Sequence, residues 1–554
     1  MPKFQEEKTQ RKTAALRKRE EEEVTKLLAD RYKIPHADLS VFPIELDALK
    51  LLSEETSRSG ELAIIRISGK HLEIAVHKPD KPETMTILNR LTQDDYAYDL
   101  FLASASSLEH AWEFYKKMPP PHEMNIGSIQ ISSERIAHMQ EQVTTIGQIK
   151  DLVHDAFTSR TSEALEAIMG GALAVNASDI HIEPQSDTIR LRFRLDGVLY
   201  DIIDIPNKLF KFLLSRIKLI SELKINIHDR AQDGRFTIKI KPTDIEVRTS
   251  TLPGPNGENI VMRILNPRAI DVKFSELGMQ PWVSQAMERE MNRPNGMILT
   301  TGPTGSGKTT TLYTFLRTIY NPTIKIITLE DPIEYHLAGI AQTQVDSEKG
   351  YDFANGLRSI VRQDPDVILV GEIRDLETAD IALQAALTGH LVFSTLHTND
   401  AAGTIPRLID LGVKPQSIAP ALNVAMAQRL IRKLCLQCRM KGKLDDEQKK
   451  AIENEFLNFP KSVAIPGQHE WQIFTAAQSG CDACNHTGYK GRLGIFEIIF
   501  IDETIEKLIL ASPSEFDIKK GAIAQGQITM RQDGILKILA GITDYDEYER
   551  VVGI

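Results

Sequence analysis

The sequence predicts an α/β protein of several domains, and three observations lead to this expectation. Its 554 residues exceed the usual size of one domain, and 42% of them are hydrophobic, enough for several cores. A glycine-rich turn lies between an apolar run at 297–299 and a helical pattern at 312–319. Further apolar segments alternate with helical stretches, as in a mainly parallel sheet covered by helices, at 324–329, 367–370 and 391–395.

The glycine-rich turn has the residues and spacing of a phosphate-binding loop. Its glycines let backbone N–H groups point at phosphate oxygens, Lys308 adds a positive charge, and the Thr309 hydroxyl can bind Mg²⁺. The following helix directs its positive end at the same anion. We therefore expect this loop to bind ATP and Mg²⁺ through Gly302, Pro303, Thr304, Gly305, Ser306, Gly307, Lys308, Thr309 and Thr310.

Polar residues follow each predicted strand of this domain and should converge on the triphosphate. Glu372 is the acid of a Walker B element, although Gly371 stands where an Asp that orients the metal is usual. We expect Glu372 to orient and activate the attacking water, with Glu330 as the alternative base or metal contact. His397, at the end of its strand, is the expected γ-phosphate sensor in preference to His390.

A predicted hairpin upstream places two arginines face to face. Strands at 245–249 and 259–264 flank a turn centred between Pro255 and Asn256, which sets Arg248 directly opposite Arg263. Opposed cations are destabilising unless an anion lies between them, so the pattern suggests an anion clamp. The alternative is that each arginine pairs with a separate surface carboxylate.

Another predicted strand carries three potential metal ligands on one face. These are Asp179, His181 and Glu183, at the period of two that a strand requires. Because no companion ligand cluster lies beside them in the sequence, we expect hydrogen bonds within the domain.

The four cysteines form two C-x-x-C pairs, Cys435 with Cys438 and Cys481 with Cys484. This arrangement suits a tetrahedral zinc site that closes an excursion of roughly forty residues. Four thiolates leave no open coordination position, so we expect a structural zinc; a redox pair or unliganded thiols are the alternatives.

Composition limits the class of protein. A formal charge of −10 does not favour a general nucleic-acid binder. No signal peptide is recognisable, and the longest uncharged run, 381–399, contains polar residues and is better explained as a buried helix and strand than as a membrane span. We therefore expect a cytoplasmic protein.

Breaks in composition suggest the domain boundaries. A run of Lys, Arg and Glu precedes a small N-terminal α/β pattern, and three prolines at 119–121 open a linker before a second α/β domain. The expected parts are a charged tail at 1–23, an N-terminal domain at 24–118, a linker at 119–155, a second domain at 156–270, and the nucleotide-binding domain at 271–554 with the zinc insertion at 435–484.

Taken together, the motifs resemble one family, from about residue 177 to the C-terminus. They are ASDIHIEP (177–184), QDGR (232–235), GPTGSGKTT (302–310), LEDPIEY (329–335), RQDPDVILVGEIRD (362–375), TGHLVFSTLHTNDA (388–401), QRLIRKLC (428–435) and GYKGR (488–492). The chain resembles the hexameric ATPases that power type II secretion and type IV pilus assembly, the GspE/PilB type.

The resemblance implies a RecA-like nucleotide domain, a PAS-like second domain, an N-terminal docking domain and a ring of six subunits. It would make 330–334 the family's Asp box, Glu372 its catalytic glutamate and His397 part of its His box, with Arg248 and Arg263 approaching the nucleotide. The cysteine pairs resemble its metal-binding insertion. The N-terminal domain lacks the Arg-Leu-Gly opening of the cyclic di-GMP motif, so we do not expect nucleotide signalling there.

The function implied is a homohexameric motor that hydrolyses ATP and drives assembly of pilus or secretion pseudopilus subunits. It would reach the inner membrane through a platform protein and would not bind nucleic acid. The residues leave open whether a pilus, a secretion system or DNA uptake is served. Two alternatives from other classes are a nucleic-acid translocase and a nucleotide-gated scaffold that does not hydrolyse ATP.

Overall fold

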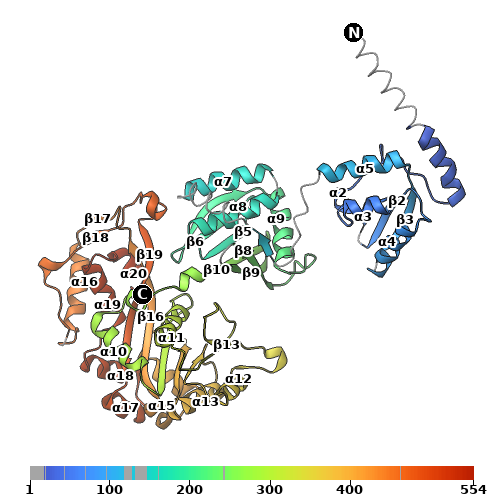
Figure 1. The fold of residues 1–554 in the computed structure, drawn as a ribbon. Coiled ribbons are helices and arrows are strands. Elements are labelled where there is room, and N and C mark those ends of the chain that lie inside the picture. The colour runs from blue at the N-terminus through green and yellow to red at the C-terminus, as the bar shows by residue number, and fades with distance from the viewer. Residues whose placement is uncertain are drawn as a thin grey trace. The chain divides into compact units, whose positions relative to one another are not determined.

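The computed structural model describes Lys18 and residues 20–42, 44–68, 70–94, 96–117, 128–130, 146–159, 161–240, 244–461 and 463–553. The chain divides into two compact units, Met1–Asn125 and Ile126–Ile554, which we describe in turn (Figure 1). The predicted charged tail lies mostly outside the described residues, although residues 20–32 are helical.

The first unit is a three-stranded sheet with helices on both faces. Strand β2 pairs antiparallel with β1 and parallel with β3. Because side chains alternate along β1, Leu62 and Ile64 enter a core with α4, whereas Ala63 and Ile65 enter a core with α5. The α/β pattern expected for the N-terminal domain is confirmed. The elements are α2 (Leu46–Leu49), α3 (Glu54–Ser59), β1 (Leu62–Ser68), β2 (His71–Val76), α4 (Pro82–Gln93), β3 (Ala97–Leu102) and α5 (Ala105–Lys117).

The second unit begins with a seven-stranded sheet, in the order β4-β8-β9-β10-β5-β6-β7, which we call the second domain. One face packs against three helices, and the opposite face is polar, as a mostly antiparallel sheet allows. Its elements are β4 (Ser128–Gln130), α7 (Ile146–Ser159), α8 (Thr161–Ala174), β5 (Asp179–Pro184), β6 (Ile189–Leu195), β7 (Val198–Ile205), α9 (Asn207–Ile220), β8 (Gln232–Lys239), β9 (Ile245–Gly254), β10 (Gly257–Leu265) and η1 (Pro267–Ile270).

Helix α7 lies partly within the range expected to be a linker. Most of that range is outside the described residues, but α7 begins at Ile146, and its Ile149 and Val153 side chains are fully buried in the core of the second domain. The polar composition before Thr144 does not continue into α7, whose apolar residues recur at helical spacing.

The C-terminal domain is built on a second seven-stranded sheet, ordered β13-β12-β14-β15-β11-β16-β19. All neighbouring strands are parallel except β16 and β19, so the predicted mainly parallel sheet is confirmed. Helices α10 and α11 cover one face, and α12 to α15 with α17 and α18 cover the other. The strands are β11 (Gly296–Thr301), β12 (Ile326–Glu330), β13 (Ala341–Gln344), β14 (Val367–Val370), β15 (Leu391–Leu396), β16 (Leu422–Leu434) and β19 (Tyr489–Phe500).

The helices of this domain connect the strands or follow them. They are η2 (Phe274–Glu276), α10 (Pro281–Met291), α11 (Lys308–Ile319), η3 (Ser347–Lys349), α12 (Phe353–Val361), α13 (Leu376–Leu387), α14 (Thr404–Asp410), α15 (Pro415–Ala421), α17 (Glu503–Leu510), α18 (Glu515–Ala524), α19 (Met530–Leu539) and α20 (Tyr545–Val552). The uncharged run at 381–399 spans the end of α13 and all of β15, as expected. Within the described ranges, no helix combines the length and apolar character that crossing a bilayer requires.

An insertion between β16 and β19 contains the cysteines. It includes β17 (Met440–Lys441), α16 (Asp446–Leu457), η4 (Gln468–Glu470), β18 (Phe474–Thr475) and η5 (Asp482–Cys484). Ile452 on α16 packs with Ile538 and Tyr548 from α19 and α20, so the insertion shares a core with the C-terminal helices.

Candidate active site

The glycine-rich loop links β11 to α11, as its motif predicts. Gly302 has φ +145°, and a Cβ there would lie 2.6 Å from the Gln428 carbonyl oxygen; at Gly307, with φ +89°, it would lie 2.9 Å from the Gln428 side-chain nitrogen. Side chains are thus excluded where the backbone curves. The Ser306 hydroxyl is buried without a protein partner in the described part of the chain, which fits a loop shaped to receive an anion.

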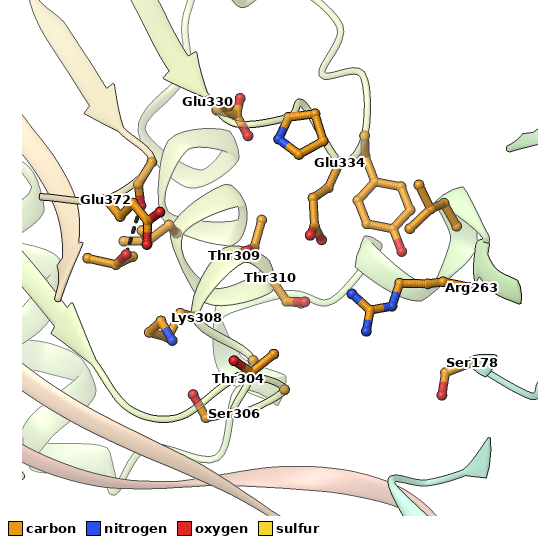
Figure 2. Close-up of a pocket in the computed structure, with 18 of the residues that line it drawn as sticks. Ser178, Arg263, Thr304, Ser306, Lys308, Thr309, Thr310, Glu330, Glu334 and Glu372 are labelled. Carbon is orange, nitrogen blue, oxygen red and sulfur yellow. Dashed lines mark hydrogen bonds between the residues drawn. The ribbon is translucent and has the colours of Figure 1, made fainter. Parts of the chain in front are cut away.

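Lys308 lies at the first turn of α11, with its ammonium inside the loop. It donates to the carbonyl oxygens of Gly302 and Pro303, at 2.7 and 3.2 Å. Burial lowers the pKa of Lys308, and the nearby Glu372 carboxylate opposes that shift. Thr309 and Thr310 follow on the same turn and line the cleft described next (Figure 2).

The loop and the strand ends border one cleft of about 920 Å³. Glu330 ends β12, Glu372 follows β14 and His397 follows β15, and all three line it, as the carboxyl ends of parallel strands should. The polar face of the second domain forms the far wall, where Arg263 and Ser178 lie across from the loop (Figure 2). The structure therefore brings together residues separated by more than two hundred positions in the sequence.

Glu372 is contacted by two basic side chains, one that also follows β14 and one that follows β15. His397 Nε2 lies 3.0 Å from one carboxylate oxygen, and Arg374 forms an ion pair with the other. Arg374 also approaches Asp331, at 3.7 Å. Sequence reasoning did not single out Arg374, although a basic residue two positions after the Walker B acid was a visible signal.

Glu330 is buried, with 4% of its surface exposed, and its carboxylate is tightly held. Among the described residues, its donors are the Tyr313 hydroxyl, the Thr328 hydroxyl at 2.6 Å and the Gln342 amide at 3.2 Å. Tyr313 comes from α11 and Gln342 from β13. Sequence reasoning missed both, because neither belongs to a motif with a known chemical role.

The structure gives a physical reason for glycine at the Walker B position. The Gly371 amide donates to the Leu329 carbonyl oxygen at 2.7 Å, so the ends of β12 and β14 lie close together. A Cβ at Gly371 would be 3.2 Å from that oxygen and 3.6 Å from the Phe353 ring. A side chain at this position would therefore press its Cβ against the end of β12, which glycine avoids.

The hairpin register is confirmed: Arg248 on β9 lies directly opposite Arg263 on β10. Each arginine also has its own carboxylate, as the alternative expected, since Arg263 is 3.1 Å from Asp179 and Arg248 is 3.4 Å from Glu246. Only Arg263 of the pair lines the cleft; Arg248 donates to the Ile333 carbonyl oxygen at 2.6 Å. The pair thus touches both the cleft and the segment that follows Glu330.

The three acidic and imidazole groups on β5 make hydrogen bonds within the second domain, as expected. Arg192 contacts Glu183 at 2.6 Å, and Arg194 contacts Asp179 at 3.2 Å. Burial lowers the pKa of His181, and the Arg194 charge lowers it further. His390 has a similarly structural setting: it precedes β15, away from the cleft, and its Nδ1 lies 2.9 Å from the Ala385 carbonyl oxygen.

The four cysteines meet as predicted. Their sulfur atoms all lie within 4.8 Å of one another. Among the described residues, these cysteines form a cluster of side chains that could together hold a metal ion. Although burial opposes the shift, the backbone N–H groups of Cys481 and Gly488 lower the pKa of Cys484 to about 7. Four thiols in this arrangement fit a tetrahedral zinc ion.

A phosphate loop on a parallel sheet, with acidic strand ends above it, defines a P-loop ATPase. Residues 156–550 match the family model described as "Type II/IV secretion system protein", and residues 32–120 match the MshEN domain. The chain therefore belongs to the type II/IV secretion system protein family. Like the ATPases of this family, it is a P-loop ATPase.

Relatives agree with this assignment. The chain is 35% identical over 538 residues to "Type IV pilus assembly ATPase PilB" of Myxococcus xanthus, covering 97% of this chain and 91% of that protein. It is 41% identical over 416 residues to "Type II secretion system protein E" of Pseudomonas aeruginosa, covering 75% and 80%. The X-ray structure of the Legionella pneumophila ATPase DotB has the same fold over 70% of this chain and 94% of its own, with a TM-score of 0.50 and 21% identity.

Proposed function

We propose that this protein is a homohexameric cytoplasmic motor that hydrolyses ATP to assemble pilin-like subunits at the inner membrane. The observation that carries the proposal is the single cleft where the phosphate loop, the acidic strand ends and the arginine of the second domain face one another. The names of the relatives supply the process, a type IV pilus or a type II secretion pseudopilus. An inner-membrane platform protein would receive the motion.

Each residue has a role in this proposal that its position supports. The loop amides, Lys308 and the positive end of α11 hold the phosphates. Glu372 orients the attacking water, because its carboxylate lies at the strand end inside the cleft beside His397. His397 then senses the γ-phosphate through its contact with Glu372. Glu330 is the alternative base, but its carboxylate is already engaged by several donors.

The residues present fit Mg²⁺. The Thr309 hydroxyl and the carboxylates of Glu330 and Glu372 line the same cleft and offer oxygen ligands, which this ion prefers. When bound, the ion neutralises charge on the phosphate oxygens. Thr309 would hold it directly, with the carboxylates acting through water.

The second domain completes the site. Arg263 extends from the far wall toward the cleft, and Arg248 contacts the chain just after Glu330. A bound triphosphate would draw these arginines toward the loop, because anions and guanidinium groups form strong charge-assisted hydrogen bonds. Closure of the second domain on the C-terminal domain is thus the motion we propose to be transmitted to the platform.

The experiment is complementation of a null strain with wild type, Glu372→Gln, or the matched control Glu377→Gln, an exposed acid on α13. We expect Glu372→Gln to abolish surface filaments or secretion, whichever process is served, while the control supports it. Purified wild type that binds ATP but never releases phosphate in any oligomeric form would contradict the proposal and favour a scaffold. Salt-sensitive DNA binding would favour a translocase.

A further inference from the structure

A hydrogen-bond chain, buried at Tyr313 and Glu330 and part-buried beyond them, joins the phosphate-loop helix to the second domain. It begins at Tyr313, which lies on α11 one turn after Thr309 and has no exposed surface. The Tyr313 hydroxyl donates to Glu330 at the end of β12. Burial, followed by the charge of Glu330, raises the pKa of Tyr313, so the phenol stays protonated and acts as a donor.

The chain continues through Gln342 on β13. Its amide nitrogen donates to Glu330 at 3.2 Å and to the Tyr335 carbonyl oxygen at 3.0 Å, while its oxygen accepts from the Leu337 amide at 2.7 Å. Gln342 therefore ties residues 331–337 back to the Glu330 carboxylate. Within that segment, the Ile333 carbonyl oxygen accepts from Arg248 of the second domain at 2.6 Å.

We infer that Tyr313 is a positioning residue: it fixes the Glu330 carboxylate to the phosphate-loop helix and, through Gln342, sets the segment 331–337 that Arg248 contacts. The inference rests on the proposed function for its catalytic consequence, because Glu330 borders the cleft where ATP would react. It does not require Tyr313 to touch the nucleotide. Movement of α11 on phosphate binding would pass through the side chains of Tyr313, Glu330 and Gln342 to the segment 331–337. Arg248 of the second domain contacts that segment.

The geometry explains why a tyrosine suits this position. Helix α11 is packed against the sheet, with Leu312, Phe315 and Leu316 buried around Tyr313. The ring fills part of that core, and its hydroxyl reaches the strand end. Phenylalanine would keep the packing and remove only the donor, leaving a buried carboxylate oxygen without its partner.

The first test compares Tyr313→Phe with Tyr489→Phe in the full-length protein. Tyr489 is the matched control, because its buried hydroxyl also donates to a carboxylate, that of Asp544, at 2.9 Å. Both variants should lose similar thermal stability. We expect Tyr313→Phe alone to lower kcat about tenfold or more, with the KM for ATP changed by less than about twofold. An equal loss of kcat in both variants would overturn the inference.

A double-mutant cycle gives the second test. If Tyr313 acts through Glu330, adding Tyr313→Phe to Glu330→Gln should change kcat by less than about twofold beyond Glu330→Gln alone. Independent, multiplicative losses would contradict this. A Glu330→Gln variant with the wild-type rate would also overturn the catalytic part of the inference.

A third test does not depend on hydrolysis. It therefore distinguishes failure of the inference about Tyr313 from failure of the proposed function. Amide hydrogen exchange is measured with and without Mg²⁺ and a slowly hydrolysed ATP analogue. In wild type, the analogue should protect both the loop 302–310 and the segment 331–337. Tyr313→Phe should keep protection of the loop and lose that of 331–337; retained protection of both overturns the inference even if the protein proves not to hydrolyse ATP.

Discussion

Gly371 shows how one missing side chain shapes the acidic side of the cleft. The amide of Gly371 binds the end of β12, and Thr395 donates to its carbonyl oxygen at 2.7 Å, so its backbone is fixed on both sides. Glu330 and Glu372 flank it. Another carboxylate there would be crowded and would repel both neighbours.

We therefore expect that restoring the usual Walker B aspartate harms this enzyme. Gly371→Asp should lower ATPase activity by more than about tenfold without lowering the Mg²⁺ concentration needed for half-maximal rate. Gly371→Ala is the matched control for bulk alone and should lose less activity. Steady-state ATPase assays across a Mg²⁺ titration measure both; a gain in Mg²⁺ affinity with Gly371→Asp would show that space exists at this position.

Glu547, on the last helix, is a buried acid whose charge contributes to stability. Its side chain is fully buried and contacts Arg432, at 2.8 Å, and Arg550, at 2.6 Å. Although burial opposes the shift, hydrogen bonds from Arg550 and Arg432 hold the pKa of Glu547 below its usual range. The folded form therefore favours the carboxylate more strongly than the unfolded form does.

Replacing Glu547 by Gln should cost roughly 3 kcal/mol at pH 7, because it leaves Arg432 without its buried counterion. The contribution of the native carboxylate is complete above the unfolded pKa, about 4.3, and disappears as pH falls through the lowered folded pKa. Thermal melts of wild type and Glu547→Gln should thus converge as the pH falls below about 4. Glu549→Gln, exposed on the same helix, should melt like wild type throughout.

At the scale of elements, the sequence predicted how strands pair and where their ends meet better than it predicted hydrogen bonds between side chains. The turn at Pro255 and Asn256 gave the correct register of β9 and β10, because a strand period of two and a short turn leave little choice. The convergence of Glu330, Glu372 and His397 followed from parallel strands sharing one edge. Both predictions depend on local geometry that the sequence encodes directly.

Other parts of the site depended on contacts between distant elements. In the sequence, Tyr313 is one more apolar position of an amphipathic helix. Its hydrogen bond to Glu330 could be recognised only once β12 was placed beside α11. Arg374 stands two positions after Glu372 in the sequence, but its approach to Asp331 became apparent only once the ends of β12 and β14 were adjacent. Helix α7 was missed because the break in composition before it obscured where the second domain begins. Pairings of this kind require the three-dimensional arrangement.

The cysteine insertion should contain one zinc ion per chain. We expect atomic absorption on the purified protein to show a ratio near one, and Cys481→Ser to lose the metal and loosen the insertion, because the two pairs close it from both ends. Proteolysis should then cut first between residues 435 and 484. Asp482→Asn, an exposed neighbour, serves as the control and should retain zinc. Wild-type protein that contains no metal would contradict the prediction of a structural zinc ion.

At the scale of the whole molecule, the second domain presents a row of arginines on its polar face. Arg235, Arg248 and Arg263 lie side by side on β8, β9 and β10. Asp179 and Arg194 extend the row onto β5 and β6. Asp179 and Glu246 neutralise part of this charge, but the four arginines outnumber them, so the row stays positive and an anion against this face is favoured.

We expect Arg263→Ala to lower kcat/KM for ATP about tenfold or more, since it removes the guanidinium on the far wall of the cleft. Arg190→Ala, exposed on β6 of the same sheet but away from the row, is the matched control and should keep the wild-type value. Raising the salt concentration should weaken ATP binding less in Arg263→Ala than in wild type. If Arg263→Ala and Arg190→Ala have the same kinetics, Arg263 does not contribute to ATP binding or hydrolysis.

Strand β16 lies between β11 and β19 in the sheet of the C-terminal domain and is a long strand. Its 13 residues span about 40 Å when extended. At the middle of the strand, the Gln428 side-chain oxygen accepts a hydrogen bond from Thr311 of the phosphate-loop helix at 2.9 Å. Farther along, Arg432 donates to Tyr200 of the second domain at 3.1 Å, and Cys435 follows the last residue. Strand β16 therefore contacts the phosphate-loop helix and the second domain and leads directly into the cysteine-bearing insertion. A fluorophore attached to the cysteine-bearing insertion would therefore be placed to report movements of this strand when nucleotide binds.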